Sequence, residues 1–175
     1  MGDTMTVADR HVHPGHERGP MLAPTVQRVR ELVVSYRPFR CQLPVEGTVT
    51  GPRDAAKLAG ALLAGADVER VLALHFNVRH RLIGVHVVSV GTLDATLVHP
   101  RDVFKAAVLS NASGLILAHN HPSGDPTPSG EDRALSDRLR QAGELLGVDL
   151  LDFVIVTDPI DGFRYYSFKE SGVLA

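Results

Sequence analysis

The segment Leu115-Ile-Leu-Ala-His-Asn-His-Pro-Ser-Gly-Asp-Pro-Thr-Pro-Ser-Gly-Glu-Asp132 combines three kinds of local structure. It starts with the continuous apolar run Leu115–Ala118, which is typical of a strand buried on both faces. Three prolines and a glycine within 122–128 exclude regular structure there. From Ser129 onward apolar residues recur at helical spacing, and Gly147 is a typical helix terminator. The segment therefore predicts a buried strand, a stiff loop and a helix.

Outward from this segment, hydrophobic periodicity predicts further strands and helices. The predicted strands are Val26–Tyr36, Val68–Phe76, Leu82–Val90, Leu150–Thr157 and a short one at Ala95–Val98, and the predicted helices are 50–64, 100–110 and the one from Ser129. The core candidates in the helix at 100–110 are Val103, Ala107 and Leu109. In the helix from Ser129, the apolar residues at helical spacing are Ala134, Leu135, Leu139, Ala142 and Leu146. The polar residues 77–81 between two strands indicate an antiparallel hairpin. This order predicts an α/β or α+β layer fold, with a mixed sheet flanked by helices.

The chain of 175 residues has room for one domain with a substantial hydrophobic core. We expect a flexible tail at 1–24, a strand and linker at 25–49, and the domain itself at 50–175. The tail contains His11, His13 and His16. They could bind a metal in principle, but no predicted element fixes the backbone around them, so we interpret them as solvated.

Composition narrows the classes of function and the compartment. There are 18 basic and 20 acidic residues, a formal net charge of −2, and no long basic run, which argues against nucleic-acid binding through bulk electrostatics. Cys41 is the single cysteine, so neither an internal disulfide nor a cysteine-based metal site is expected. Without a signal peptide or an apolar stretch of ~20 residues, we expect a cytoplasmic protein with no membrane segment.

The two histidines that follow the buried strand are the main chemical signal. His119 and His121 are two residues apart, so in an extended chain their side chains point to the same side. Asp132 lies in the first turn of the next helix and can face back toward them. Two imidazoles, one carboxylate and a fourth position left for water form the catalytic pattern of zinc, although these ligands also admit Fe(II), Mn(II) or Co(II).

Helix capping offers another interpretation of Ser129 and Asp132. Ser-x-x-Asp resembles a capping box, in which the serine accepts the backbone N–H of the third following residue. Asp132 cannot be called a ligand from this context alone. The histidine pair, on a buried strand before a rigid loop, favours the metal site.

These residues together resemble a known motif. His119-x-His121-x7-Ser129-x2-Asp132 is similar to the JAMM motif of the JAB/MPN metalloproteases, and the surrounding residues resemble the bacterial RadC branch. The resemblance covers roughly residues 50 to 175 and implies a single JAB/MPN-like domain with cytidine-deaminase-like layering. It also implies that His119, His121 and Asp132 bind Zn²⁺, that Ser129 hydrogen-bonds the substrate oxyanion, and that Glu69 is the general base.

The resemblance thus implies a zinc metallopeptidase or isopeptidase that acts on a peptide or protein substrate. Three departures accompany it. Asp102 stands where the family usually has Glu, Phe153 stands where it commonly has His, and the helix-hairpin-helix module of long RadC proteins is absent from this sequence.

Two other functions use similar chemistry or share the family. A zinc nucleoside deaminase needs His-x-Glu followed by Pro-Cys-x-x-Cys, which this chain lacks. A DNA-repair-associated or scaffolding module, with a metal site but no peptidase turnover, stays open as the alternative. The oligomeric state stays unknown.

Overall fold

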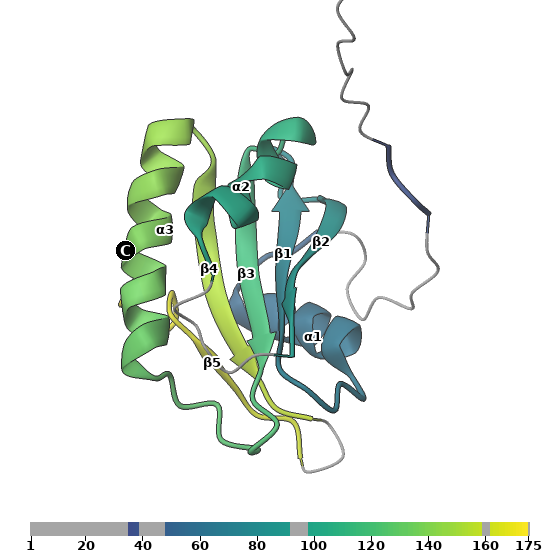
Figure 1. Cartoon of the computed structure of the whole chain (residues 1–175), viewed down its shortest axis with the longest axis vertical. Helices are drawn as coiled ribbons and strands as arrows, with labels where there is room; N and C mark the ends of the chain where they lie inside the picture. Colours follow the sequence, from purple (N-terminus) through teal and green to yellow (C-terminus); the bar gives the residue numbers. More distant parts are fainter. Residues whose placement is uncertain (1–34, 39–47, 92–97, 159–161, 175) are drawn as a thin grey trace, which may run out of the picture. The chain divides into compact units, whose positions relative to one another are not determined.

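The computed structural model describes residues 35–38, 48–91, 98–158 and 162–174. Its helices are α1 (Pro52–Leu63), α2 (Pro100–Leu109) and α3 (Gly130–Leu146), and its strands are β1 (Arg70–Phe76), β2 (Leu82–Val90), β3 (Gly114–Asn120), β4 (Asp149–Val156) and β5 (Tyr165–Ser167) (Figure 1). None of these helices is long and apolar enough to cross a membrane.

The described strands form one mixed sheet in the order β2-β1-β3-β4-β5. β1 is antiparallel to β2 and β3, β3 is parallel to β4, and β4 is antiparallel to β5. A parallel pair needs a crossover connection, which α3 provides between β3 and β4. The end of β3 therefore lies at the same edge of the sheet as the beginning of β1 and the end of β4, where a site can form.

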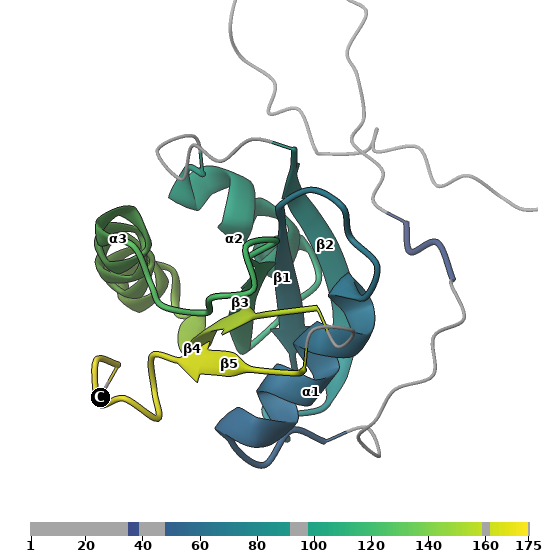
Figure 2. The ribbon, with the colours of Figure 1, turned by 90° about the horizontal axis from the view of Figure 1, so that it is seen from below.

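The helices cover both faces of the sheet, with α2 and α3 on one face and α1 on the other (Figure 2). Successive side chains of β3 point to opposite faces, so β3 contributes to two cores. Leu115 and Leu117 pack with the α2 and α3 side chains, whereas Ile116 and Ala118 pack with α1. All seven residues of β3 are buried, which confirms the prediction of a strand covered on both sides.

The structure confirms the predicted fold class. The expected helices and the hairpin of β1 and β2 are present, with small differences at their ends. α3 ends at Gly147, whose φ of 66° is in the left-handed region that glycine tolerates. The strand predicted at Val26–Tyr36 lies largely outside the described residues, as does most of Ala95–Val98.

Some predicted details are wrong. Leu109 is 48% exposed because α2 buries Val103, Phe104 and Ala107, and a residue two positions after Ala107 points away from that face. Of the apolar residues at helical spacing in α3, Leu135 and Leu139 are buried, whereas Ala134 is exposed and Leu146, at the end of the helix, is 52% exposed. β5 was not predicted.

Candidate metal centre

β3 brings the two histidines to the edge of the sheet. His119 lies within β3, opposite Val71 of β1 and Ile155 of β4. His121 follows the strand, and its backbone N–H donates to the Val156 carbonyl at 3.0 Å. The ring centroids of the two histidines are 4.7 Å apart. The structure therefore places the two imidazoles side by side, as their spacing predicted.

Asp132 reaches the same point from the first turn of α3, where it also caps the helix. The Ser129 hydroxyl accepts the Asp132 backbone N–H at 3.1 Å, and the Asp132 Oδ2 accepts the Ser129 backbone N–H at 2.8 Å. The Ser129 hydroxyl also lies 2.7 Å from Asp132 Oδ2, to which it donates. The capping interpretation is thus confirmed. It does not exclude metal binding, because capping fixes the carboxylate in the orientation in which it meets the histidines.

Both imidazoles direct Nε2 toward this carboxylate. His119 Nε2 lies 3.6 Å from Asp132 Oδ1, and His121 Nε2 lies 3.9 Å from Asp132 Oδ2. Their other ring nitrogens face oxygen acceptors. His119 Nδ1 is 3.2 Å from Glu69 Oε1, and His121 Nδ1 is 2.7 Å from the Asp125 backbone carbonyl. The carbonyl can only accept, so His121 Nδ1 donates to it and the lone pair is left on Nε2. The Glu69 carboxylate beside His119 Nδ1 favours the same tautomer there, which is how such acceptors commonly prepare histidines to bind a metal.

The donor set fits a divalent transition metal. One ligand atom from each of His119, His121 and Asp132 lies within 4.8 Å of the others. His119 Nε2 is buried and has no hydrogen-bond partner, which is costly for a polar atom unless another group binds there. Two nitrogens and one carboxylate oxygen match the three protein ligands of a catalytic zinc site. These residues could therefore hold a metal ion.

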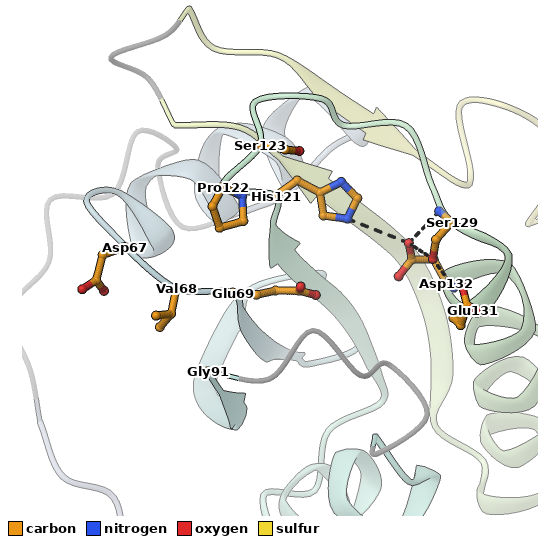
Figure 3. A pocket seen from close by; sticks show the side chains of 10 residues that line it. All are labelled: Asp67, Val68, Glu69, Gly91, His121, Pro122, Ser123, Ser129, Glu131 and Asp132. Carbon is orange, nitrogen blue, oxygen red and sulfur yellow. Dashed lines mark hydrogen bonds and ion pairs between the residues drawn. The ribbon is translucent and has the colours of Figure 1, made fainter.

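Glu69 lies beside this cluster, immediately before β1. Its side chain is 11% exposed, and its carboxylate points into the same cavity as His121, Ser129 and Asp132 (Figure 3). The cavity has a volume of about 780 Å³, and it is also lined by Asp67, Val68, Gly91, Pro122, Ser123 and Glu131. Glu69, proposed as the base from family resemblance, is thus adjacent to the candidate ligands although it lies fifty residues away in the sequence.

The loop between β3 and α3 is held by its own hydrogen bonds. Asp125 Oδ1 accepts from the backbone N–H and the hydroxyl of Thr127, and these bonds hold the pKa of Asp125 below its usual value. Gly124 adopts a φ of 76°, and its carbonyl accepts a hydrogen bond from the Arg164 guanidinium. These contacts hold in place the Asp125 carbonyl, which accepts the hydrogen bond from His121 Nδ1.

Phe153 and Asp102, at which the sequence departs from the motif it resembles, have different surroundings. Phe153 is fully buried, and its ring meets the His119 ring edge-on at 5.2 Å while it stacks on Phe168 at 4.8 Å. The Phe153 ring therefore packs against His119 as an apolar surface and forms no hydrogen bond with it. Asp102 lies on α2 and pairs with Lys105 at 3.3 Å.

Sequence reasoning missed two contributors to the site. The Asp125 carbonyl could not be assigned, because a backbone acceptor leaves no residue-type signal. Asn120 was given no role, although it stands between the two histidines and is buried.

Comparison with known proteins places this geometry in a family. The RadC-like JAB domain matches residues 49–173. A UPF0758 protein of Thermotoga maritima is 52% identical over 108 residues, which are 62% of this chain and 46% of the relative. A UPF0758 protein of Shouchella clausii is 43% identical over 131 residues, 75% of this chain and 55% of the relative. One of Rubrobacter xylanophilus is 38% identical over 160 residues, 91% of this chain and 66% of the relative.

The chain spans about half the length of the first two of these relatives. The names of these relatives state no activity. The family match covers most of the chain, including the candidate ligands, Ser129 and Glu69. The chain belongs to the RadC-like JAB domain family.

Proposed function

We propose that this chain is a zinc-dependent hydrolase of peptide or isopeptide bonds. The observation that carries the proposal is the arrangement of His119 Nε2, His121 Nε2 and the Asp132 carboxylate, with Glu69 beside them in an open cavity. JAB domains include metalloproteases, so the family is consistent with this chemistry. Its relatives here carry no stated activity, so the proposal depends on the site.

Zinc, held by His119, His121 and Asp132, would supply Lewis acidity, which lowers the pKa of a water ligand toward ~7 and polarises a carbonyl. Zinc is favoured over calcium or magnesium because two of the three donors are imidazole nitrogens. The cavity is partly open to solvent, so a substrate can approach the residues that line it.

Glu69 is the proposed general base and acid. Its Oε1 lies 3.2 Å from His119 Nδ1, a shorter distance than the 3.6 Å and 3.9 Å that separate the Asp132 oxygens from the two imidazoles. It would take a proton from the attacking water and later deliver it to the departing amine. Its contact with His119 Nδ1 gives it a second task, which is to hold that imidazole with Nε2 free.

Ser129 is the proposed oxyanion donor. Its hydroxyl lies at the cavity wall and donates to Asp132 Oδ2 at 2.7 Å. Rotation about its Cβ–Oγ bond would redirect the proton to a substrate oxygen that gains negative charge. Removal of one such donor typically slows an enzyme by about 100- to 1000-fold.

The test is hydrolysis by the zinc-loaded chain of two probes: a pool of internally quenched peptides, and peptides joined through a lysine ε-amine. We expect new amines to be released from at least one probe by wild type, and none by Glu69→Gln with its zinc content unchanged. Normal turnover by Glu69→Gln would refute the assignment of the base. No release from either probe by wild type would refute the peptidase proposal.

A metal-bearing binding module without turnover is the second candidate. One observation favours it: Glu69, Ser129 and Asp132 each already make a structural hydrogen bond or contact, so none needs a catalytic role to explain its position. A zinc-loaded wild type that retains metal but cleaves neither probe would support this candidate. Binding to DNA would be tested by gel shift against salt, and no binding at low salt would exclude it.

A further inference from the structure

Asn120 stands between the two histidines but points to the opposite face of the sheet. Successive strand residues alternate sides, so the Asn120 side chain leaves the histidines and faces the segment between α1 and β1. It is only 5% exposed. Its Oδ1 accepts the Arg70 backbone N–H at 2.9 Å, and its Nδ2 donates to the Val68 backbone carbonyl at 3.1 Å. One side chain therefore holds the residues immediately before and after Glu69.

These two bonds continue the sheet beyond its last backbone pair. The register between β1 and β3 ends where Val71 lies opposite His119. Past that point, the Asn120 side-chain amide makes the two hydrogen bonds to the backbone of residues 68–70 that a neighbouring strand would otherwise make. On the other side, the Gly91 backbone N–H donates to the Glu69 carbonyl at 2.9 Å. The backbone around Glu69 is thus held from β3 and from the end of β2.

We infer that Asn120 is a positioning residue, which fixes Glu69 so that its carboxylate reaches His119 Nδ1 and the cavity. The residue type matters, because the site needs one donor and one acceptor from a short side chain. An aspartate has no donor for the Val68 carbonyl, and a leucine has neither group. The inference about the Glu69 contact rests on the structure alone, and its consequence for catalysis rests on the proposed function.

The first test measures the hydrogen bond itself, without metal and without substrate. In the metal-free chain, hydrogen exchange of the Arg70 amide is followed by NMR in wild type, Asn120→Ala and Ser113→Ala. Ser113 is the matched control, because its hydroxyl donates to the Phe76 carbonyl at 3.2 Å and joins the opposite ends of the same two strands. We expect Arg70 to exchange about tenfold faster only in Asn120→Ala, the equivalent of one lost hydrogen bond. Unchanged exchange in Asn120→Ala would overturn the inference.

The second test measures whether Asn120 acts through Glu69. Zinc affinity is compared in Asn120→Ala, Glu69→Ala and the double variant. If Asn120 acts by holding Glu69 on His119, its replacement weakens zinc binding in the wild-type chain but has no further effect once Glu69 is alanine. Equal losses in both backgrounds would contradict this, because Asn120 would then act on the ligands independently. Ser113→Ala should bind zinc normally.

The third test concerns turnover of whichever probe the wild type cleaves. Displacement of a catalytic group by about 1 Å can cost about 100-fold in rate. We therefore expect kcat of Asn120→Ala to fall about 100-fold with KM nearly unchanged, while Ser113→Ala keeps the wild-type kcat. A wild-type kcat in Asn120→Ala would overturn the catalytic part of the inference. If wild type cleaves neither probe, the proposed function fails, and the exchange and zinc tests still decide the role of Asn120.

Discussion

Replacement of Glu69 should weaken metal binding even though Glu69 is not among the candidate ligands. Its Oε1 lies 3.2 Å from His119 Nδ1, and the two side chains are 11% and 3% exposed. Loss of an outer partner of a metal-ligating histidine typically weakens metal binding by about 10- to 100-fold, and each factor of ten corresponds to about 1.4 kcal/mol. Glu69→Ala should therefore lower zinc affinity by about 10- to 100-fold.

The assay is a zinc titration in competition with a chelating indicator, with two further variants beside Glu69→Ala. Glu69→Gln keeps an oxygen acceptor for His119 Nδ1, so its affinity should stay close to that of wild type. Glu131→Ala removes the same charge from an exposed position on the wall of the same cavity. If Glu131→Ala weakens zinc binding as much as Glu69→Ala does, the loss reflects the reduced negative charge of the cavity and not the contact with His119. The reasoning from the His119 contact is then refuted.

Three further predictions concern catalysis, pH and packing. Ser129→Ala should lower kcat about 100- to 1000-fold, and the loss of the helix cap should lower the free energy of unfolding by about 1 kcal/mol. A lower melting temperature with an unchanged kcat would show that Ser129 only caps the helix. Burial lowers the pKa of His75 from 6.5 to about 4, so its neutral form favours the folded state. The contribution of neutral His75 to the free energy of unfolding is complete above pH 6.5 and is lost as the pH falls toward 4. By pH 5 this loss amounts to about 2 kcal/mol. Chemical denaturation at pH 7.5 and pH 5 measures this loss. The free energy of unfolding of His75→Leu should change less between the two pH values than that of wild type, and an equal change would contradict the role given to His75. Gly143→Ala would bring a Cβ to 2.5 Å from the Val148 carbonyl, so we expect a loss of at least about 1–3 kcal/mol in the same denaturation experiment, and wild-type stability would show that this contact relaxes freely.

The sequence predicts the strand, loop and helix around the candidate ligands well, because each has a strong local cause. β3 is apolar on both faces, the prolines exclude regular structure from the loop, and Ser129 begins α3 with a complete capping box. These local signals place His119, His121 and Asp132 correctly relative to one another. No contact with a distant part of the chain is needed to predict that they meet.

The remaining parts of the site depend on distant contacts. Glu69 reaches His119 only because β1 pairs with β3, and the residue type alone gives no sign of this. The bonds of Asn120 go to the backbone of residues fifty or more positions earlier. β5 has three residues, too few to show a hydrophobic period, and is defined by its pairing with β4. The prediction that Leu109 belongs to the core is wrong for a related reason, since the orientation of α2 depends on the sheet against which it packs.

Metal analysis of the purified chain tests the central claim most directly. Zinc per chain is measured in wild type, in His121→Ala, and in a variant with His11, His13 and His16 all replaced by alanine, which controls for metal bound by the N-terminal histidines. We expect one zinc per chain in wild type and in the triple variant, and a large loss in His121→Ala. Equal zinc in His121→Ala and wild type, with loss in the triple variant, would contradict a metal centre at His119, His121 and Asp132.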